Sequence, residues 1–169
     1  METDFAGWHD FYVMFGGAVA GLTGLVVVAM SIHLRAIANS ALHRGLARGS
    51  LTGLIVILVL CGVALFPGQT TSRFGAELLV IGVALQVMTI VLAARDQRAS
   101  GAAARRRRVR IALYRSIPTL VAAIGVLMVA GVAIAPYLLA IALLVPIGFI
   151  VNNVWALLIE ISGEHRAAT

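Results

Sequence analysis

Long apolar runs separated by short polar segments dominate the chain from residue 11 onward. A helix crosses a membrane with about 20 apolar residues, because each residue adds ~1.5 Å of rise. The first three runs come close to this length and end at polar segments such as Pro67-Gly68. They predict transmembrane helices over residues 11–33, 50–66 and 74–94.

The last apolar run, residues 111–161, is too long for one crossing. As one helix it would extend about 75 Å, whereas the hydrocarbon core of a bilayer is ~30 Å thick. A chain reversal at Pro146 would leave a final segment that is too short to cross. A reversal at Pro136 instead predicts two spans, 117–134 and 137–161.

Two further prolines fit this division. Ser116 is the expected N-cap of the span 117–134, and Pro118 then lies in its first turn, where a missing N–H has no consequence. Pro146 falls inside the last span, where it frees a backbone carbonyl one turn earlier. We therefore expect a polar backbone group in the interior of that span.

Composition supports a membrane protein. Hydrophobic residues make up 61% of the 169 residues and charged residues 12%, whereas soluble domains have about one half and one quarter. A chain of this length has too much surface to hide the excess in a core. We predict an all-α fold, an integral membrane bundle of five transmembrane helices in a single domain over residues 1–169. The one cysteine, Cys61, is expected to be a small apolar packing residue.

The arginines predict how the bundle is oriented. Arginine supplies all basic residues, and the absence of lysine excludes Schiff-base chemistry. One side of the five-span bundle carries Arg35, Arg44, Arg48, the basic segment 95–115 and Arg166, and the other carries only Arg73. The positive-inside rule then places the N-terminus outside and the C-terminus in the cytoplasm. Four aromatic residues fall at the outer ends, as in an interfacial belt: Trp8, Tyr12, Phe74 and Tyr137.

The densest basic cluster is RRRRVR, which contributes Arg105, Arg106, Arg107, Arg108 and Arg110. Near an anionic leaflet each arginine adds on the order of 1 kcal/mol of attraction. We expect an interfacial helix over 102–115 that contacts anionic lipids of the cytoplasmic leaflet. The cluster lies outside an apolar span, which excludes a voltage sensor. It lacks interleaved aromatic residues, so nucleic acid is not an expected partner.

The first span carries a row of small residues at Gly17, Gly21 and Gly24. Small residues let helix backbones approach closely in lipid, so this row is predicted to pack against another helix. A span of the same chain is the favoured partner, and another subunit is the alternative.

Polar side chains within the spans are the main candidates for function. Asn153 and Glu160 share one helix face, whereas Asn152 points about 100° away. Interhelical hydrogen bonding is the favoured interpretation, with Gln86 a partner for Asn153. The alternative is a polar path in an oligomer, with Asp10 and Glu77 concentrating cations at its outer mouth. The candidate residues are Gln86, Asn152, Asn153 and Glu160.

Neither metal, cofactor nor catalytic chemistry is predicted. His9 and His33 lie at opposite ends of the first span, and no HxxxH or CxxC spacing occurs. No GxSxG motif, phosphate-binding loop or pair of acids within one span is present either.

The stretches FGGAVAGLTGLVVVAMSIHL, PGQ and NNVWALLIEI together resemble small bacterial multi-span membrane proteins of uncharacterised function. The resemblance covers most of the chain and implies a bacterial inner membrane, but it brings no activity or functional residues. Three classes of function remain. We place a small oligomeric channel or transporter-like bundle first, a non-catalytic accessory or scaffold subunit of a membrane complex second, and an intramembrane enzyme third. A homo-oligomer or another membrane protein is the expected partner.

Overall fold

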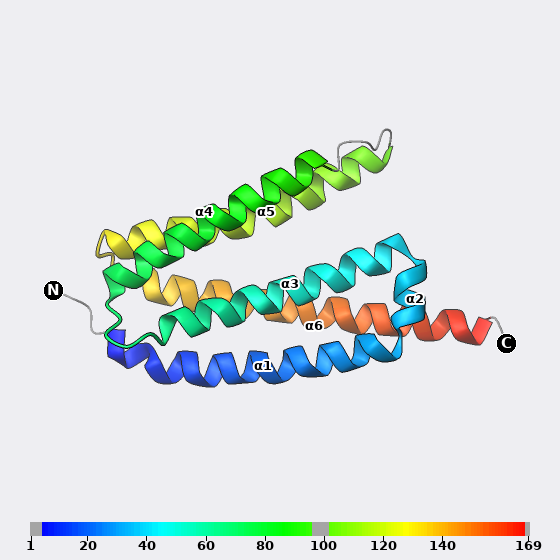
Figure 1. Ribbon diagram of the computed structural model, residues 1–169, viewed down its shortest axis with the longest axis horizontal. Helices are drawn as coiled ribbons and strands as arrows, with labels where there is room; N and C mark the ends of the chain where they lie inside the picture. The colour runs from blue at the N-terminus through cyan, green and yellow to red at the C-terminus, as the bar shows by residue number, and fades with distance from the viewer. Residues whose placement is uncertain (1–4, 96–101, 168–169) are drawn as a thin grey trace. The chain divides into compact units, whose positions relative to one another are not determined.

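The computed structural model describes residues 5–95 and 102–167, and all regular structure in these ranges is helical (Figure 1). Side chains are not described at residues 6, 36, 41, 42, 92–95, 102–115, 157, 158 and 160–167. A short 3-10 helix, Phe5–Trp8, precedes α1 (His9–Ile32), α2 (Leu34–Asn39), α3 (Ala41–Ala64), α4 (Thr71–Arg95), α5 (Ala102–Val129) and α6 (Ala135–Ala167). The all-α class is therefore confirmed.

Four helices in the described part of the chain are long and apolar enough to cross a membrane. They correspond to four of the predicted spans, with candidate crossings over His9–Ile32, His43–Ala64, Thr71–Val91 and Ala135–Ala156. The remaining apolar segment, Ser116–Val129, is shorter. At ~1.5 Å per residue it extends about 21 Å.

The boundaries of α5 differ from the predicted ones. The helix begins at Ala102 and runs without a break through Ser116 and Pro118, so Ser116 is not an N-cap and 102–115 is not a separate helix. The stretch before Ser116 is rich in alanine and arginine, which both favour helix. The helix then ends at Val129, before the predicted residue 134. Two residues later Gly131 adopts a positive φ of 74°, which glycine tolerates without strain.

The predicted reversal before Pro136 is confirmed. Residues 130–134 form a turn, and Pro136 is the second residue of α6, where its missing N–H breaks no helical hydrogen bond. Pro146 lies inside α6, as expected.

The chain forms two compact units, and the first contains Phe5 and residues 68–140. Its centre is the antiparallel pair of α4 and α5. Phe74 at the start of α4 is completely buried, and the centroid of its ring lies 5.0 Å from the ring centroid of Phe5. Phe74 is therefore a core residue rather than part of a lipid-facing aromatic belt.

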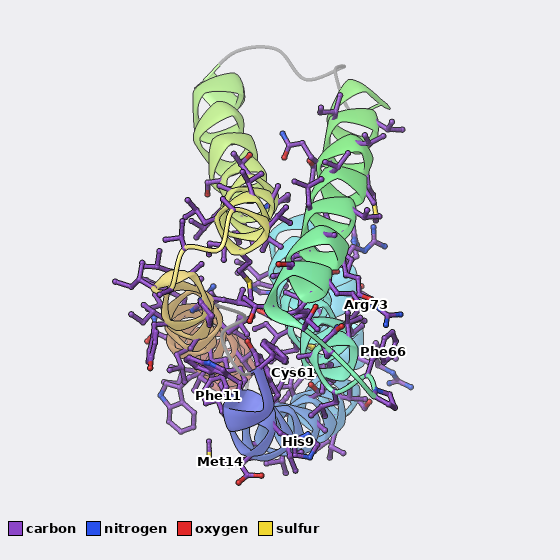
Figure 2. All side chains as sticks on the ribbon, turned by 90° about the vertical axis from the view of Figure 1, so that its left-hand side faces the viewer. His9, Phe11, Met14, Cys61, Phe66 and Arg73 are labelled. Atoms are coloured by element: carbon purple, nitrogen blue, oxygen red, sulfur yellow. The ribbon has the colours of Figure 1, made fainter. Side chains whose placement is uncertain are left out.

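The second unit contains residues 6–67 and the part of α6 from Ile141 onward. Within it, α3 runs opposite to α1, and α6 runs in the same direction as α1 (Figure 1). Cys61 on α3 is buried beside Gly16 of α1, whereas Met14 points away on the outer side of α1 (Figure 2). Tyr12 is completely buried too, which removes a second residue from the predicted belt.

The corner between α1 and α3 is built by local polar contacts. The side chain of Ser40 caps α3 by accepting a hydrogen bond from the backbone N–H of His43 at 3.3 Å. Arg44 donates a hydrogen bond back to the carbonyl of Ala38 in α2. These contacts stabilise the junction between α2 and α3, so the chain reverses over the six residues of α2.

Candidate functional site

The two carboxamides of α6 lie on the surface of the second unit. Leu143, Ile150 and Val154 form the buried face of α6, and Gly53 of α3 approaches Ile150 so closely that a Cβ there would lie 3.0 Å from its Cδ1. Asn152 and Asn153 are both exposed. Neither amide is used to pack α6 within this unit, so each is available to a group outside it.

Gln86 of α4 belongs to the first unit and lines a largely open cavity of about 630 Å³. Its Oε1 is buried and accepts no hydrogen bond within the described part of the chain. Two hydroxyl residues of α5 share the cavity, Ser116 and Thr119. The cavity is completed by Ile117, Leu120 and Ala123. An amide and two hydroxyls on apolar walls can bind a small polar group, or a water molecule, by hydrogen bonds.

Gln86 therefore lies in the first unit and Asn153 in the second. Their predicted hydrogen bond stays a prediction. The backbone carbonyl of Gln86 accepts a hydrogen bond of 2.8 Å from Thr89 Oγ1 on the same helix.

The glycine row of α1 faces open space. A Cβ at Gly17, Gly21 or Gly24 would meet no atom within 4 Å. No described helix of its own unit lies against this row. Its packing against another span of the same chain, or against another subunit, stays a prediction.

Sequence analysis missed the glycines that do bring helices together. A Cβ at Gly75 of α4 would lie 2.8 Å from the Gly125 carbonyl oxygen of α5, and a Cβ at Gly82 would lie 2.8 Å from the Ala122 backbone nitrogen. These residues form the glycine seam of α4 and α5: Gly75, Gly82, Ala122 and Gly125. The sequence did contain a signal for this seam. Gly75 and Gly82 are seven residues apart, and Ala122 and Gly125 are three apart, so each pair lies on one face of its helix.

The acid at the start of α4 is already engaged. Glu77 accepts a hydrogen bond from Gln69 Nε2 at 2.6 Å and lies 3.7 Å from Nε of Arg73. Its carboxylate is thus hydrogen-bonded to the loop before α4 and lies near a local arginine. The expected role of Glu77 in gathering cations stays a prediction.

The remaining predicted residues lie outside the described side chains. The backbone places Arg105, Arg106, Arg107, Arg108 and Arg110 in α5 and Glu160 in α6, and nothing further is described for them. No group of three or more histidine, cysteine or acidic side chains that could hold a metal occurs among the described residues.

Comparisons with known proteins add no family or activity. No family model, curated protein or solved structure matches this chain. Its described features are a helical fold with four membrane-compatible helices, two exposed amides on α6 and an open, mostly apolar cavity beside Gln86.

Proposed function

We propose that the protein is an integral membrane protein with five spans. The directions of the helices in the second unit support an odd number of crossings. Because α3 runs opposite to α1 and α6 runs parallel to it, α4 and α5 together must make an even number of crossings. α4 is long enough to cross alone, so α5 must cross back. Its apolar part is short, but arginine side chains in general can reach the headgroup region along their aliphatic stems, which lets a short apolar segment cross.

The membrane is the bacterial inner membrane, with the N-terminus outside and the C-terminus in the cytoplasm. The distribution of arginines supports this orientation. Arg105–Arg108 and Arg110 contact anionic lipids of the cytoplasmic leaflet in this arrangement.

Its role is that of a non-catalytic subunit that assembles with another membrane protein chain through α6. The exposure of Asn152 and Asn153 within the apolar segment Ala135–Ala156 of α6 carries this proposal. An amide left unpaired in hydrocarbon costs roughly 2–7 kcal/mol, whereas an amide paired across a helix interface does not incur that cost. Polar groups that face away from their own unit are therefore typical of a chain that is completed by a partner.

The mass of the native particle tests this role. We expect wild-type protein, extracted with its surrounding lipid by an amphipathic copolymer, to have a particle mass above that of one chain. The variant Asn152→Leu/Asn153→Leu is expected to shift toward the mass of one chain. Val87→Leu/Met88→Leu on α4 is the matched control, because both positions are exposed and apolar. A wild-type particle with the mass of one chain would refute the assembly role.

A channel or transporter-like function is the second candidate, and the cavity at Gln86 favours it. A buried acceptor oxygen beside two hydroxyl residues can replace part of the hydration shell of a small polar solute. Purified protein in liposomes then passes an ion or small solute, and Gln86→Leu changes the flux at least severalfold, whereas Val87→Leu does not. Liposomes that remain tight with wild-type protein would exclude this candidate.

A further inference from the structure

The polar residues of the cavity beside Gln86 lie at one level of the antiparallel pair α4 and α5. A Cβ at Gly82 would lie 2.8 Å from the Ala122 backbone nitrogen, so these two residues are level with each other. Gln86 follows Gly82 by four residues, or about one helical turn. It is therefore level with the turn of α5 that contains Ser116 and Thr119, and these three residues line the cavity together.

The rest of the cavity wall is apolar. Leu120 and Ala123 lie further along α5, and Ile117 completes the wall. None of the described lining residues is ionisable, and those of α5 are all exposed, whereas Val121 and Ile124 are buried on another side of that helix. An open, uncharged cavity with its polar groups at one end and apolar walls beyond them fits an amphiphile.

Gln86 determines what the polar end of such a ligand must carry. Its Oε1 is buried and accepts no hydrogen bond within the described part of the chain, which is unfavourable for a carbonyl oxygen. Only a ligand with an O–H or N–H group can satisfy it. The side chain of Gln86 is flexible, so a change of rotamer turns the oxygen toward a ligand in the cavity. Hydroxyl groups such as those of Ser116 and Thr119 both donate and accept, so they suit the same polar end.

The depth of Gln86 restricts the charge of the ligand. The candidate crossing of α4 ends at Val91, five residues or about 7.5 Å beyond Gln86. The apolar segment of α5 begins at Ser116. In the proposed membrane placement these polar groups thus lie below the headgroups of the cytoplasmic leaflet. A charged phospholipid headgroup does not enter this depth, because a charge in hydrocarbon is costly.

We propose that the cavity beside Gln86 binds a membrane-dissolved, uncharged amphiphile whose polar end carries a hydroxyl group, such as a long-chain alcohol or a quinol. The hydroxyl group donates to Gln86 Oε1, and the apolar chain lies along Leu120 and Ala123. The proposal rests on the membrane placement proposed above. It narrows the solute of the second candidate function to a lipid-soluble one.

Photolabelling of the protein in phosphatidylcholine liposomes tests the site. The probe is a long-chain alcohol with a diazirine next to its hydroxyl-bearing carbon, and its methyl ether is the matched control because it has no donor. We expect the alcohol to label the lining residues of α4 and α5, located by peptide mass spectrometry. The labelling should saturate, and 1-dodecanol should compete with it, whereas dodecyl methyl ether should not.

The second arm tests the amide. Gln86→Met keeps the length of the side chain without its amide, and we expect it to weaken binding of the alcohol about three- to thirtyfold, the range for one hydrogen bond within a membrane. Val87→Leu, at the exposed apolar neighbour, is the matched control and should bind as wild type does. The free energy of unfolding of Gln86→Met should not fall, since Oε1 has no described donor to lose.

Equal labelling by the alcohol and its ether, or equal binding by wild type and Gln86→Met, would overturn the proposal. A clear loss of stability in Gln86→Met would overturn it too, because the amide would then already be paired within the protein. A photoreactive alkane separates these failures from failure of the membrane placement. If the alkane labels the exposed residues Val83 and Val87 but the alcohol does not label the cavity, only the ligand is refuted. If the alkane does not label α4, the membrane placement is refuted as well.

Discussion

Helices α1 and α4 both contain glycines, but only those of α4 lie against the backbone of a neighbouring helix along a seam. In α4 a Cβ at Gly82 would collide with the backbone of Ala122, whereas in α1 a Cβ at Gly21 would meet nothing within 4 Å. The α1 glycines have the familiar spacing of four residues, and the α4 glycines are seven apart. The difference shows that a glycine row permits close approach, while small residues on the partner helix decide where it occurs. For α4 that partner is Ala122–Gly125 of α5.

The largest expected effect is at the glycine seam of α4 and α5. Gly125→Ala places a methyl group 2.7 Å from the Gly75 carbonyl oxygen and 2.8 Å from the Leu79 backbone nitrogen. Backbone atoms cannot turn aside as a side chain can, so the helices must separate. We expect the free energy of unfolding, measured by denaturant titration in detergent micelles, to fall by about 1–3 kcal/mol.

The matched control is Gly21→Ala in α1. The added methyl meets no atom, and alanine favours helix over glycine by up to about 1 kcal/mol. Stability should therefore stay unchanged or rise. Equal losses from the two substitutions would contradict the distinction between the two helices.

An intermediate effect is expected at Gly16, the one α1 glycine with a close contact. Its Cβ would lie 3.2 Å from Cys61 Cβ, so the neighbours need to shift by only a few tenths of an ångström. We expect Gly16→Ala to lower the free energy of unfolding by roughly 1 kcal/mol or less. A double-mutant cycle with Cys61→Gly, which removes the opposing Cβ, should show a coupling of about 0.5 kcal/mol or more.

Cys61→Ala provides the control for this cycle because it retains the Cβ and removes only the sulfur. The effect of Gly16→Ala should be the same in that background as in wild type. Full relief of the Gly16→Ala loss by Cys61→Ala would show that the sulfur, 3.9 Å away, causes the conflict instead.

Helix type was predictable because long apolar runs indicate helices, but the extent was predictable for some helices only, since α3 begins at Ala41 and not at the expected residue 50. The first span was expected over 11–33 and the helix covers His9–Ile32. The extent of α5 was not predicted, because a capping signal at Ser116 was weighed above the helix preference of the preceding alanines and arginines. Its end did have a signal, since Gly131 follows Val129 by two residues.

The exposed face of α6 was not predictable from the sequence for a physical reason. Aliphatic residues dominate both its buried and its exposed faces, such as Leu143 on one side and Val145 on the other. A helix that is apolar all round has no hydrophobic asymmetry that distinguishes its faces. Sequence reasoning therefore singled out Asn153, whereas Asn152 and Asn153 are both exposed. The burial of Leu143, Ile150 and Val154, with Ile150 packed against Gly53, shows which side of α6 faces its own unit.

The smallest expected effect, that of Arg73→Ala, lies at the polar start of α4, where a comparison with Glu77→Ala separates the glycine seam from its surroundings. Glu77→Ala removes the acceptor of the Gln69 hydrogen bond and should lower the free energy of unfolding by about 0.5–1.5 kcal/mol. Arg73→Ala should change it by less than ~0.5 kcal/mol, because the arginine side chain is 65% exposed and its ion pair with Glu77 is loose at 3.7 Å. The Arg73 effect should disappear in high salt, whereas that of Gly125→Ala should persist, since a steric conflict is not screened. Denaturant titrations of the three variants at two salt concentrations provide the measurement. A salt-resistant loss from Arg73→Ala as large as that from Gly125→Ala would contradict this ranking of the local polar contacts of α4 below its backbone approach to α5.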